Sequence, residues 1–530
     1  MKLKVRLQKE KREIELSHEP GRTALQTMRE GGVTLPSLCD GMGKCGKCKV
    51  RFIGTAPLPS QADRAVLDPV QLREGYRLAC MARPMKDSVI ETAFDMSQRI
   101  GTVTASHIGD EQTEEDRWED RIEEEIKGTD AEKQTLIAVD IGTTTIAMEL
   151  RRAASGKVLD VYTCLNPQSA YGTDVIARIR AGIEGHGGKL QQLVQGVLKA
   201  GIRQFSQMAE REKLCPPKKM VISCNTTMGH IFMGYPLNSL GQSPFQPVNI
   251  GAVSLEWEGL QTFLVPGFSA FVGGDILSGL YACGLCDKEL YDKDLYDTGL
   301  YGQEKEGNWL FIDLGTNAEM AMGIGGRIVA TAAAAGPAFE GRGRGGALGA
   351  ERIAAIAVLL EQGILDETGL MREPWFEKGA EVQIDIPDGK GGREKKKVWI
   401  TQEDIRDIQM AKGAVRTGIH FMAKALTGGS YEQIERVYVA GGLGFYLDQS
   451  AAARIGLVPE QLQSKMKTVG NTSLAGAGLL GRELWRAEGL PTEQVWDVMK
   501  GLEDYAVGIH VFNLAESPGF EENYINFMNF

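Results

Sequence analysis

The sequence predicts an α/β protein with three successive parts: a small strand-rich unit, an acidic linker and a large region in which strands and helices alternate. Three observations support this division. Glycine is abundant, at 65 of 530 residues, as expected where tight turns approach phosphate groups. Four of the nine cysteines lie before residue 95. After Gln134, apolar strands repeatedly run into Gly/Thr/Asn turns and then into helical patterns.

Length and charge exclude several classes of protein. A chain of 530 residues is too long for one hydrophobic core, and about 150 residues per domain predicts three or four units. The net charge of −11 argues against a general nucleic-acid or anionic-membrane binder. No apolar run is long enough to span a membrane, and the first residues lack the apolar core of a signal peptide. We therefore expect a cytoplasmic protein whose cysteines are ligands or buried thiols.

The domain boundaries follow changes in composition. Short alternating runs predict strands in the first unit, at Lys2–Leu7, Glu13–Leu16, Lys47–Phe52 and Val89–Ala93. The expected domains are residues 1–95, a linker at 96–133, a first lobe at 134–286, a charged insertion at 287–308 and a second lobe at 309–530.

The linker is strongly acidic. Between Asp110 and Glu132, twelve carboxylates face three basic residues. Trp118, Ile122 and Ile126 recur every four residues, which predicts a short helix with a narrow apolar stripe. Two interpretations stay open: a solvated linker that lets the first domain swing, or a stripe that docks on a neighbouring domain or partner.

Four cysteines have the spacing of an iron–sulfur site. Cys39, Cys45, Cys48 and Cys80 follow the pattern C-x5-C-x2-C-x31-C. Interspersed glycines permit the positive φ values that turn loop amides toward a cluster. The segment resembles [2Fe–2S] ferredoxins whose ligand loop is one residue longer than in the plant type. Structural zinc is the alternative, although zinc sites usually pair two C-x2-C knuckles. Cys283 and Cys286 form a lone C-x2-C, a weaker candidate for metal or redox chemistry.

Two similar strand–turn–strand segments predict a nucleotide site. Leu136–Ile141 runs into Asp140-Ile-Gly-Thr-Thr-Thr145, and Trp309–Leu314 runs into Asp313-Leu-Gly-Thr-Asn317. A carboxylate at a strand end can hold Mg²⁺ through water, while amides and hydroxyls beside a glycine can surround phosphates. We expect catalytic roles for Asp140 and Asp313. The expected ATP-binding residues in these turns are Gly142, Thr143, Thr144, Gly315, Thr316 and Asn317.

A third element completes the pattern. Val437–Ala440 is a strand followed by Gly441, Gly442 and Gly444, where a backbone without side chains can approach adenine or ribose. The three elements in this order resemble the ATPase superfamily of actin, sugar kinases and heat-shock chaperones. That resemblance implies a two-lobed, ribonuclease H-like fold with an acidic residue opening the helix that connects the lobes. Asp275, after the strand Thr262–Val265, matches this place and would orient the attacking water or the Mg²⁺ shell.

Other nucleotide motifs fit less well. The chain has no G-x4-G-K-[ST] loop, so it is not a P-loop ATPase. The Gly341–Gly346 run superficially resembles a dinucleotide fingerprint, but it does not open directly from a strand.

A ferredoxin-like unit, here expected to be a β-grasp fold, joined to an actin-like ATPase resembles the reductive activators of corrinoid-dependent proteins. The resemblance rests on CDGMGKCGKC, VDIGTTTIA, FVGGDILSGL, DLGTNAEM and VAGGLG, among other segments. It implies ATP-dependent reduction of Co(II) to Co(I) in a partner corrinoid protein of a methyltransferase or O-demethylase system. The electron would pass through a [2Fe–2S] cluster, with ATP and Mg²⁺ as further cofactors. Only about 40 residues separate the two units, which leaves the oligomeric state open, a homodimer included.

The corrinoid and the electron donor belong to partners. The chain has no D-x-H-x-x-G cobalamin motif, and the donor is expected to be an external ferredoxin or flavodoxin. Two other functions stay open: a small-molecule kinase with an accessory ferredoxin domain, and an activator of another low-potential enzyme such as a radical dehydratase. The latter proteins resemble homodimers that share a [4Fe–4S] cluster, which the C-x5-C loop argues against.

Overall fold

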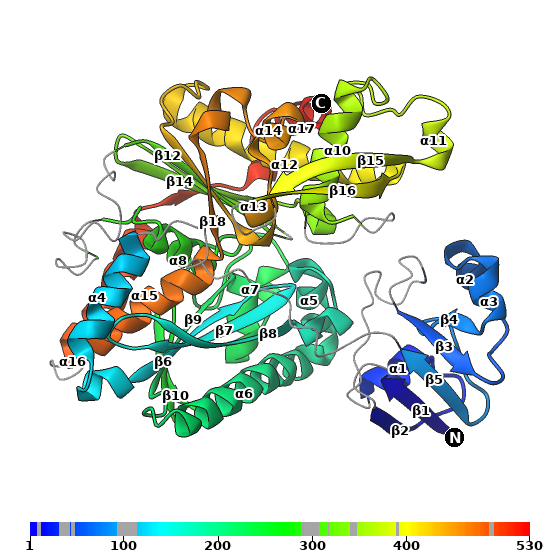
Figure 1. Cartoon of the computed structure of the whole chain (residues 1–530), viewed down its shortest axis with the longest axis horizontal. Helices are drawn as coiled ribbons and strands as arrows, with labels where there is room; N and C mark the ends of the chain where they lie inside the picture. Colours follow the sequence, from blue (N-terminus) through cyan, green and yellow to red (C-terminus); the bar gives the residue numbers. More distant parts are fainter. Residues whose placement is uncertain are drawn as a thin grey trace.

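The structure is a computed structural model of the chain. It describes residues 1–7, 12–30, 43, 48–92, 114–287, 290, 307–315, 317–339, 347–387, 392–486 and 492–530. Figure 1 shows an N-terminal domain, drawn in blue, and two further layered regions that contain the remaining sheets. Among the residues described, no helix is long and apolar enough to cross a membrane.

The N-terminal domain is a five-stranded mixed sheet with the order β2-β1-β5-β3-β4. Its strands are β1 (Lys2–Leu7), β2 (Arg12–Ser17), β3 (Lys49–Ile53), β4 (Tyr76–Leu78) and β5 (Ser88–Thr92). β1 runs parallel to β5, and the other pairs are antiparallel. Helices α1 (Ala24–Glu30), α2 (Gln61–Val66) and α3 (Pro69–Arg73) complete the domain. Leu25 and Met28 of α1 are buried in one core with Leu3 and Ile90, so the expected β-grasp arrangement is confirmed.

The linker helix is present as α4 (Glu114–Ile126), followed by a 3-10 turn at Asp130–Lys133. Ile122 packs against the core shared by the two lobes. Glu123 forms an ion pair with the Arg152 guanidinium at 2.7 Å and accepts a hydrogen bond from the Ser155 hydroxyl at 2.5 Å. The interpretation of this helix as a solvated part of a swinging linker is therefore wrong. It docks on the neighbouring domain through Ile122 and through the two partners of Glu123.

The first lobe is built on a six-stranded sheet with the order β10-β11-β9-β6-β7-β8. The strands are β6 (Thr135–Ile141), β7 (Thr145–Arg152), β8 (Val158–Leu165), β9 (Lys219–Cys224), β10 (Val253–Trp257) and β11 (Leu260–Leu264). One face is covered by α5 (Val175–Ala181), α6 (Gly187–Arg211) and α7 (Thr226–Met233). The apolar periodicity of α6 explains this cover, because Leu190, Val194 and Leu198 recur every four residues and are all buried.

The second lobe repeats this architecture with the sheet order β18-β17-β12-β13-β14-β19. Its strands are β12 (Trp309–Leu314), β13 (Ala318–Ile324), β14 (Arg327–Ala333), β17 (Arg436–Ala440), β18 (Met466–Gly470) and β19 (His510–Val511). The helices α10 (Gly349–Glu361), α12 (Gln402–Thr427), α13 (Gly441–Tyr446), α14 (Gln449–Arg454) and α17 (Phe520–Met528), with the short α11 (Trp375–Lys378), belong to this lobe. A hairpin of β15 (Ala380–Pro387) and β16 (Arg393–Ile400) packs one face against α10.

The two sheets share one topology. In each, the first three strands are antiparallel neighbours, and the fourth and fifth run parallel to the first on its other side. The order is β8-β7-β6-β9-β11 in the first lobe and β14-β13-β12-β17-β18 in the second. This duplication confirms the two-lobed, ribonuclease H-like fold that the strand–turn–strand segments predict.

Two helices cross between the lobes. Helix α8 (Gly274–Ala282) follows β11 of the first lobe, yet a Cβ added to its Gly279 would lie 2.6 Å from Phe311 of the second. Helix α15 (Thr472–Arg486) follows β18 of the second lobe, yet its Leu484 carbonyl accepts a hydrogen bond from Lys219 of the first. The two helices lie between the sheets in Figure 1, beside α16 (Thr492–Val507). The N-terminal ends of both helices lie near the end of β6, which carries Asp140.

Candidate nucleotide and cluster sites

Asp140 lies at the end of β6, opposite Ser223 of β9. Both of its carboxylate oxygens accept hydrogen bonds from the start of α15 in the other lobe. The Asn471 side-chain amide donates to Oδ2 at 2.9 Å, and the Ser473 hydroxyl donates to Oδ1 at 2.8 Å. The acid of the first lobe is therefore held by a helix that the second lobe supplies.

The turn after Asp140 is supported from behind by buried polar side chains. The fully buried Arg178 donates to the Thr143 carbonyl, and the Asn166 amide donates to the Gly142 carbonyl at 2.9 Å. The Asn225 amide donates to the Thr143 hydroxyl at 3.1 Å. Because the N–H of a trans peptide points away from its C=O, the amides of Thr143 and Thr144 face away from these supports. This orientation suits a turn that binds phosphate with its backbone.

Asp275 is brought next to Asp140, as the sequence predicts for a common site. Two glycines make this possible, because a Cβ on Gly273 would lie 2.5 Å from the Asn225 backbone and one on Gly274 would lie 2.5 Å from the Val265 carbonyl oxygen. Burial, together with the charge of Asp140, raises the pKa of Asp275 to about 7. The two carboxylates therefore share a region in which negative charge is poorly compensated.

This pair fits a magnesium ion. Mg²⁺ is usually held by one or two carboxylates, with water and substrate phosphates as its other ligands. A divalent cation beside Asp140 and Asp275 would offset the repulsion that raises the Asp275 pKa. No group of three or more His, Cys, Asp or Glu side chains suited to a metal occurs within the part of the chain that the structure describes. A cation here would thus depend on water and phosphate oxygens.

Asp313 occupies the equivalent position in the second lobe, at the end of β12 and opposite Ala440 of β17. Gly441 follows with φ +88°, and a Cβ there would lie 2.7 Å from Oδ1 of Asp313. A Cβ on Gly444 would lie 2.8 Å from the Val439 carbonyl oxygen, whereas one on Gly442 would meet open space. Gly441 and Gly444 are therefore required by close packing, and Gly442 leaves room for a ligand.

The remaining residues of the second turn are only partly described. The Gly315 amide donates to the Asn317 carbonyl at 3.1 Å, which closes the turn. Thr316 lies outside the described residues. That the two turns face each other across a nucleotide stays a prediction.

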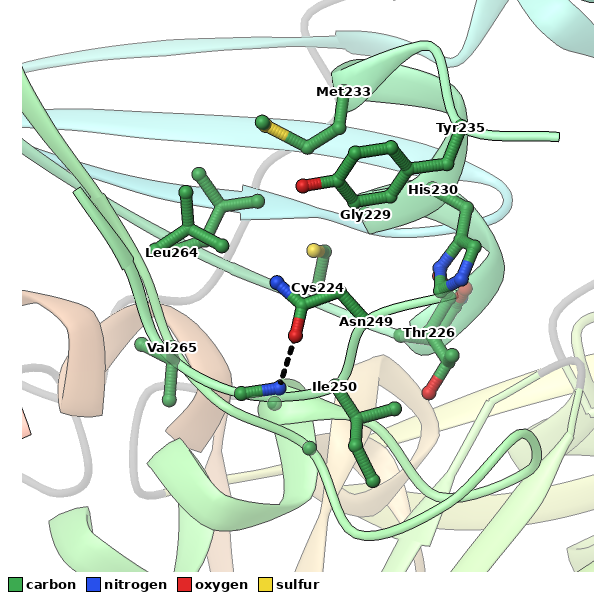
Figure 2. A pocket seen from close by; sticks show the side chains of 15 residues that line it. Cys224, Thr226, Gly229, His230, Met233, Tyr235, Asn249, Ile250, Leu264 and Val265 are labelled. Carbon is green, nitrogen blue, oxygen red and sulfur yellow. Dashed lines mark hydrogen bonds between the residues drawn. The ribbon is translucent and has the colours of Figure 1, made fainter. Parts of the chain in front are cut away.

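A small cavity of about 40 Å³ lies between the β9–α7 turn and the end of β11, and Gly274 at the start of α8 is among its lining residues. Figure 2 shows Cys224 and His230 on its wall. The His230 ring accepts a hydrogen bond from the Val248 amide, and its other nitrogen contacts the Thr226 carbonyl at 2.8 Å. This pairing describes a neutral imidazole, and burial lowers its pKa. Burial, then the charges of Asp275 and Asp140, raise the pKa of the Cys224 thiol, which makes it an unreactive neighbour of the site.

In the N-terminal domain the structure brings together Cys48 and Cys80, both buried. A hydrogen bond from Cys80 and backbone amides around Ala79 lower the pKa of Cys48 to about 7, against the opposing effect of burial. Amides directed at a sulfur are the environment that stabilises a thiolate ligand of an iron–sulfur cluster. Gly43 has φ +73°, and a Cβ there would lie 2.7 Å from that of Ala62, so the expected use of glycine is confirmed at this position. Cys39 and Cys45 lie outside the described residues.

Two weaker candidates from the sequence remain. Cys286 is packed in the core between the lobes, and no metal group includes it among the residues that can be described. The Gly341–Gly346 run falls outside the described residues.

Sequence reasoning missed the residues that hold the predicted ones. Asn471 and Ser473 contact Asp140 but carry no motif of their own. One signal could have found Asn471 and Ser473. The segment NTSLAGAGLLG follows a strand and begins a helix rich in small residues, as GGDILSGL does before α8.

Comparison with known protein families agrees with this architecture. A 2Fe-2S iron-sulfur cluster binding domain matches residues 7–85, the RACo middle region matches residues 136–288, and the C-terminal domain of RACo, described as the ASKHA domain, matches residues 307–352 and 343–530. The first of these matches supports a [2Fe–2S] cluster over zinc, and the last supports ATP binding.

Individual relatives agree as well. The chain is 28% identical over 400 residues to the corrinoid activation enzyme RamQ of Eubacterium limosum, which covers 65% of this chain and 63% of that protein. It is 31% identical over 213 residues to the [Co(II) methylated amine-specific corrinoid protein] reductase of Methanosarcina barkeri, covering 33% and 38%. A solved structure of a reductive activator for corrinoid, iron-sulfur protein aligns over 100% of this chain and 98% of its own, with a TM-score of 0.58 and 22% identity. The chain thus spans less than two thirds of the curated relatives, while the shared fold extends along its whole length.

Proposed function

Because the chain belongs to the RACo-type reductive activators, with a 2Fe-2S domain joined to RACo middle and C-terminal regions, we propose that it reduces a partner corrinoid protein from Co(II) to Co(I) in an ATP-dependent reaction. The observation that carries the proposal is the Asp140–Asp275 pair at the crossing of α8 and α15, in a chain that also pairs Cys48 with Cys80. One polypeptide thereby combines an electron-transfer domain with a nucleotide site. The names of the two curated relatives support a corrinoid protein as the partner.

The residues of the nucleotide site have distinct roles in this proposal. Asp140 and Asp275 would hold the Mg²⁺ of Mg²⁺–ATP, and Asp275 would orient the attacking water. The turns at residues 142–144 and 315–317 bind phosphates with amides and hydroxyls. Gly441, Gly442 and Gly444 accommodate adenine or ribose. A bound Mg²⁺ would offset the charge that develops on the phosphates during transfer.

The cysteines define the redox part of the proposal. A [2Fe–2S] cluster would be held by Cys39, Cys45, Cys48 and Cys80. It would supply one-electron transfer at a potential of about −400 mV. Reduction to Co(I) is uphill from such a potential, and each ~60 mV costs about 1.4 kcal/mol for one electron. Helices α8 and α15 connect the two lobes, so ATP hydrolysis between the lobes would change their arrangement. That change would stabilise the rarely formed Co(I) state of the partner.

The remaining partners follow from the sequence. The sequence has no dinucleotide fingerprint that opens from a strand, the mark of a flavin or nicotinamide site, so an external ferredoxin or flavodoxin of the cytoplasm is proposed as the electron source. The number of subunits in the active assembly is left open, a homodimer included.

The test is an anaerobic mixture of this chain, a low-potential reductant and purified Co(II) corrinoid subunits from methylated-amine and O-demethylase systems. Visible absorbance should show Co(I) with Mg²⁺–ATP and almost none without it. Co(I) formation that is equally fast without nucleotide would contradict the proposal. ATP loss that depends on a small metabolite, with no effect on cobalt, would instead favour a kinase.

A further inference from the structure

The hydrogen bonds between Asp140 and α15 are a feature that the proposed function does not use. Asp140 comes from β6 of the first lobe, whereas Asn471 and Ser473 come from the second. Each donor takes a different carboxylate oxygen, at 2.9 and 2.8 Å. A carboxylate offers about four lone-pair sites, so it can accept these two hydrogen bonds and still accept others.

The orientation of the Asn471 side chain is fixed by a second contact. Its Oδ1 accepts a hydrogen bond from the Leu474 amide at 2.9 Å, in the manner of a residue that caps a helix. Since the oxygen is thus engaged, the Nδ2 group must be the end that faces Asp140. The amide therefore acts as a bridge between the first turn of α15 and the acid.

The Ser473 hydroxyl is fixed in the same way. Ser473 and Ser223 are buried, and their hydroxyl oxygens lie 2.9 Å apart. Because a carboxylate only accepts, the Ser473 proton points to Asp140, and Ser223 is the donor between the two hydroxyls. The Ser223 hydroxyl also lies 3.3 Å from the Gly274 carbonyl, directly before Asp275, which is the other acceptor within reach of its single proton. Ser223 therefore lies between the starts of the two crossing helices, and Ser473 connects it to Asp140.

The helices that carry this network cannot shift freely against each other. A Cβ on Gly476 of α15 would lie 2.1 Å from the Ser278 carbonyl of α8, so the two backbones are in direct contact. In the register of the second sheet, Ala440 of β17 stands opposite Asp313 at the position that Ser223 of β9 takes opposite Asp140.

We infer that Asn471 and Ser473 are positioning residues that hold the Asp140 carboxylate for the nucleotide-bound divalent cation. They act through Asp140 and contact neither the cation nor ATP. The inference deepens the proposed function and rests on its ATP-binding part. Loss of a hydrogen-bond partner behind a metal-binding carboxylate typically weakens metal affinity about 10–100-fold.

The alternative is that Asn471 only caps α15, and the variant Asn471→Ser separates the two roles. Serine is also a good helix cap, so Asn471→Ser preserves the cap while its short side chain no longer reaches Asp140. Asn471→Ala removes both. Ser473→Ala removes the second donor, and Ser473→Thr keeps a hydroxyl at that position.

The experiment measures Mn²⁺ binding to the full chain with a non-hydrolysable ATP analogue, from the paramagnetic resonance signal of free Mn²⁺. We expect Asn471→Ser and Ser473→Ala to weaken Mn²⁺ binding about 10–100-fold, with Ser473→Thr close to the unaltered chain and the melting temperature of Asn471→Ser unchanged. The Mg²⁺ concentration for half-maximal ATP hydrolysis should rise in parallel.

Two results would overturn the inference, and only the second would also overturn the proposed ATP site. Unaltered Mn²⁺ affinity in Asn471→Ser and Ser473→Ala, with a lowered melting temperature only in Asn471→Ala, would leave capping as the sole role and the proposed function intact. No nucleotide-dependent Mn²⁺ binding by the unaltered chain would overturn the inference together with the proposed ATP site.

Discussion

Asp140 and Asn471 are 331 positions apart in the sequence and are joined by a 2.9 Å hydrogen bond between the two lobes. The bond exists because β6 ends where α15 begins, at the crossing of the connecting helices. Helix α15 packs along β6 and β9 of the first lobe although it follows a strand of the second. The acid proposed for the nucleotide site is therefore held by a segment that enters from the other lobe.

The cluster prediction concerns Cys48, whose thiol is buried beside Cys80. The chain purified without oxygen should contain two irons and two sulfides, and reduction should give one S = 1/2 paramagnetic signal. Cys48→Ser should lose or strongly destabilise that signal, because the ligand is removed from a pocket of amides. Cys283→Ser is the control and should leave it intact. One zinc per chain with no iron would contradict the assignment.

The nucleotide prediction concerns the two equivalent strand-end acids. Asp140→Ala and Asp313→Ala should each abolish Mg²⁺–ATP hydrolysis, since removing one oriented charge from a phosphoryl-transfer site costs several kcal/mol of transition-state stabilisation. Phosphate release measures the activity, while the cluster absorbance and the thermal transition check folding. If both variants hydrolyse ATP at the full rate, the two turns have only a structural role.

Two neighbouring glycines of the second lobe should respond differently to alanine, because Gly441 is tightly packed and Gly442 borders open space. Gly441→Ala should destabilise the second lobe by about 1 kcal/mol or more, because φ is +88° and the new Cβ would lie 2.7 Å from Asp313. Gly442→Ala places its Cβ in open space and should leave the melting temperature unchanged. Differential scanning calorimetry distinguishes them, and equal stability of the two variants would refute the packing argument.

The linker prediction uses two glutamates of α4. Glu123 and its partner Arg152 are only 20% and 11% exposed, so Glu123→Ala should leave a largely buried guanidinium without its acid and cost about 1–3 kcal/mol. Glu124 pairs with Lys127 at the surface, where both side chains are mostly exposed, and Glu124→Ala should cost under about 0.5 kcal/mol. The shift of the ATPase-domain unfolding transition measures both. A negligible effect of Glu123→Ala would restore the interpretation of α4 as solvated.

The sequence predicts those parts of the site that are encoded locally. Asp140 and Asp313 each end an apolar strand before a Gly-Thr turn, and one strand with its turn is enough to identify them. Asp275 required the family resemblance, because a Gly-Gly-Asp segment alone has many roles. Its contact with Asp140 depends on glycines that let α8 pass the β9–α7 turn.

The supporting residues could not be predicted in the same way. Asn471 and Ser473 act on an acid more than 300 residues away, and only the crossing of α8 and α15 places them there. Arginine is usually exposed on helices, yet Arg178 is fully buried and donates to the Thr143 carbonyl of the turn. The docking of α4 likewise depends on Arg152 and Ser155, which no pattern within the linker reveals.

In the proposed function, ATP hydrolysis between the two lobes is coupled to electron transfer from the N-terminal domain. The most direct test of this coupling is the rate of Co(I) formation in a purified Co(II) corrinoid protein. Visible absorbance follows that rate with the unaltered chain, Cys48→Ser and Asp140→Ala in parallel. Co(I) formation should be rapid with Mg²⁺–ATP for the unaltered chain only, and slow and nucleotide-independent for both variants. Co(I) formation by Asp140→Ala at the rate of the unaltered chain would contradict it.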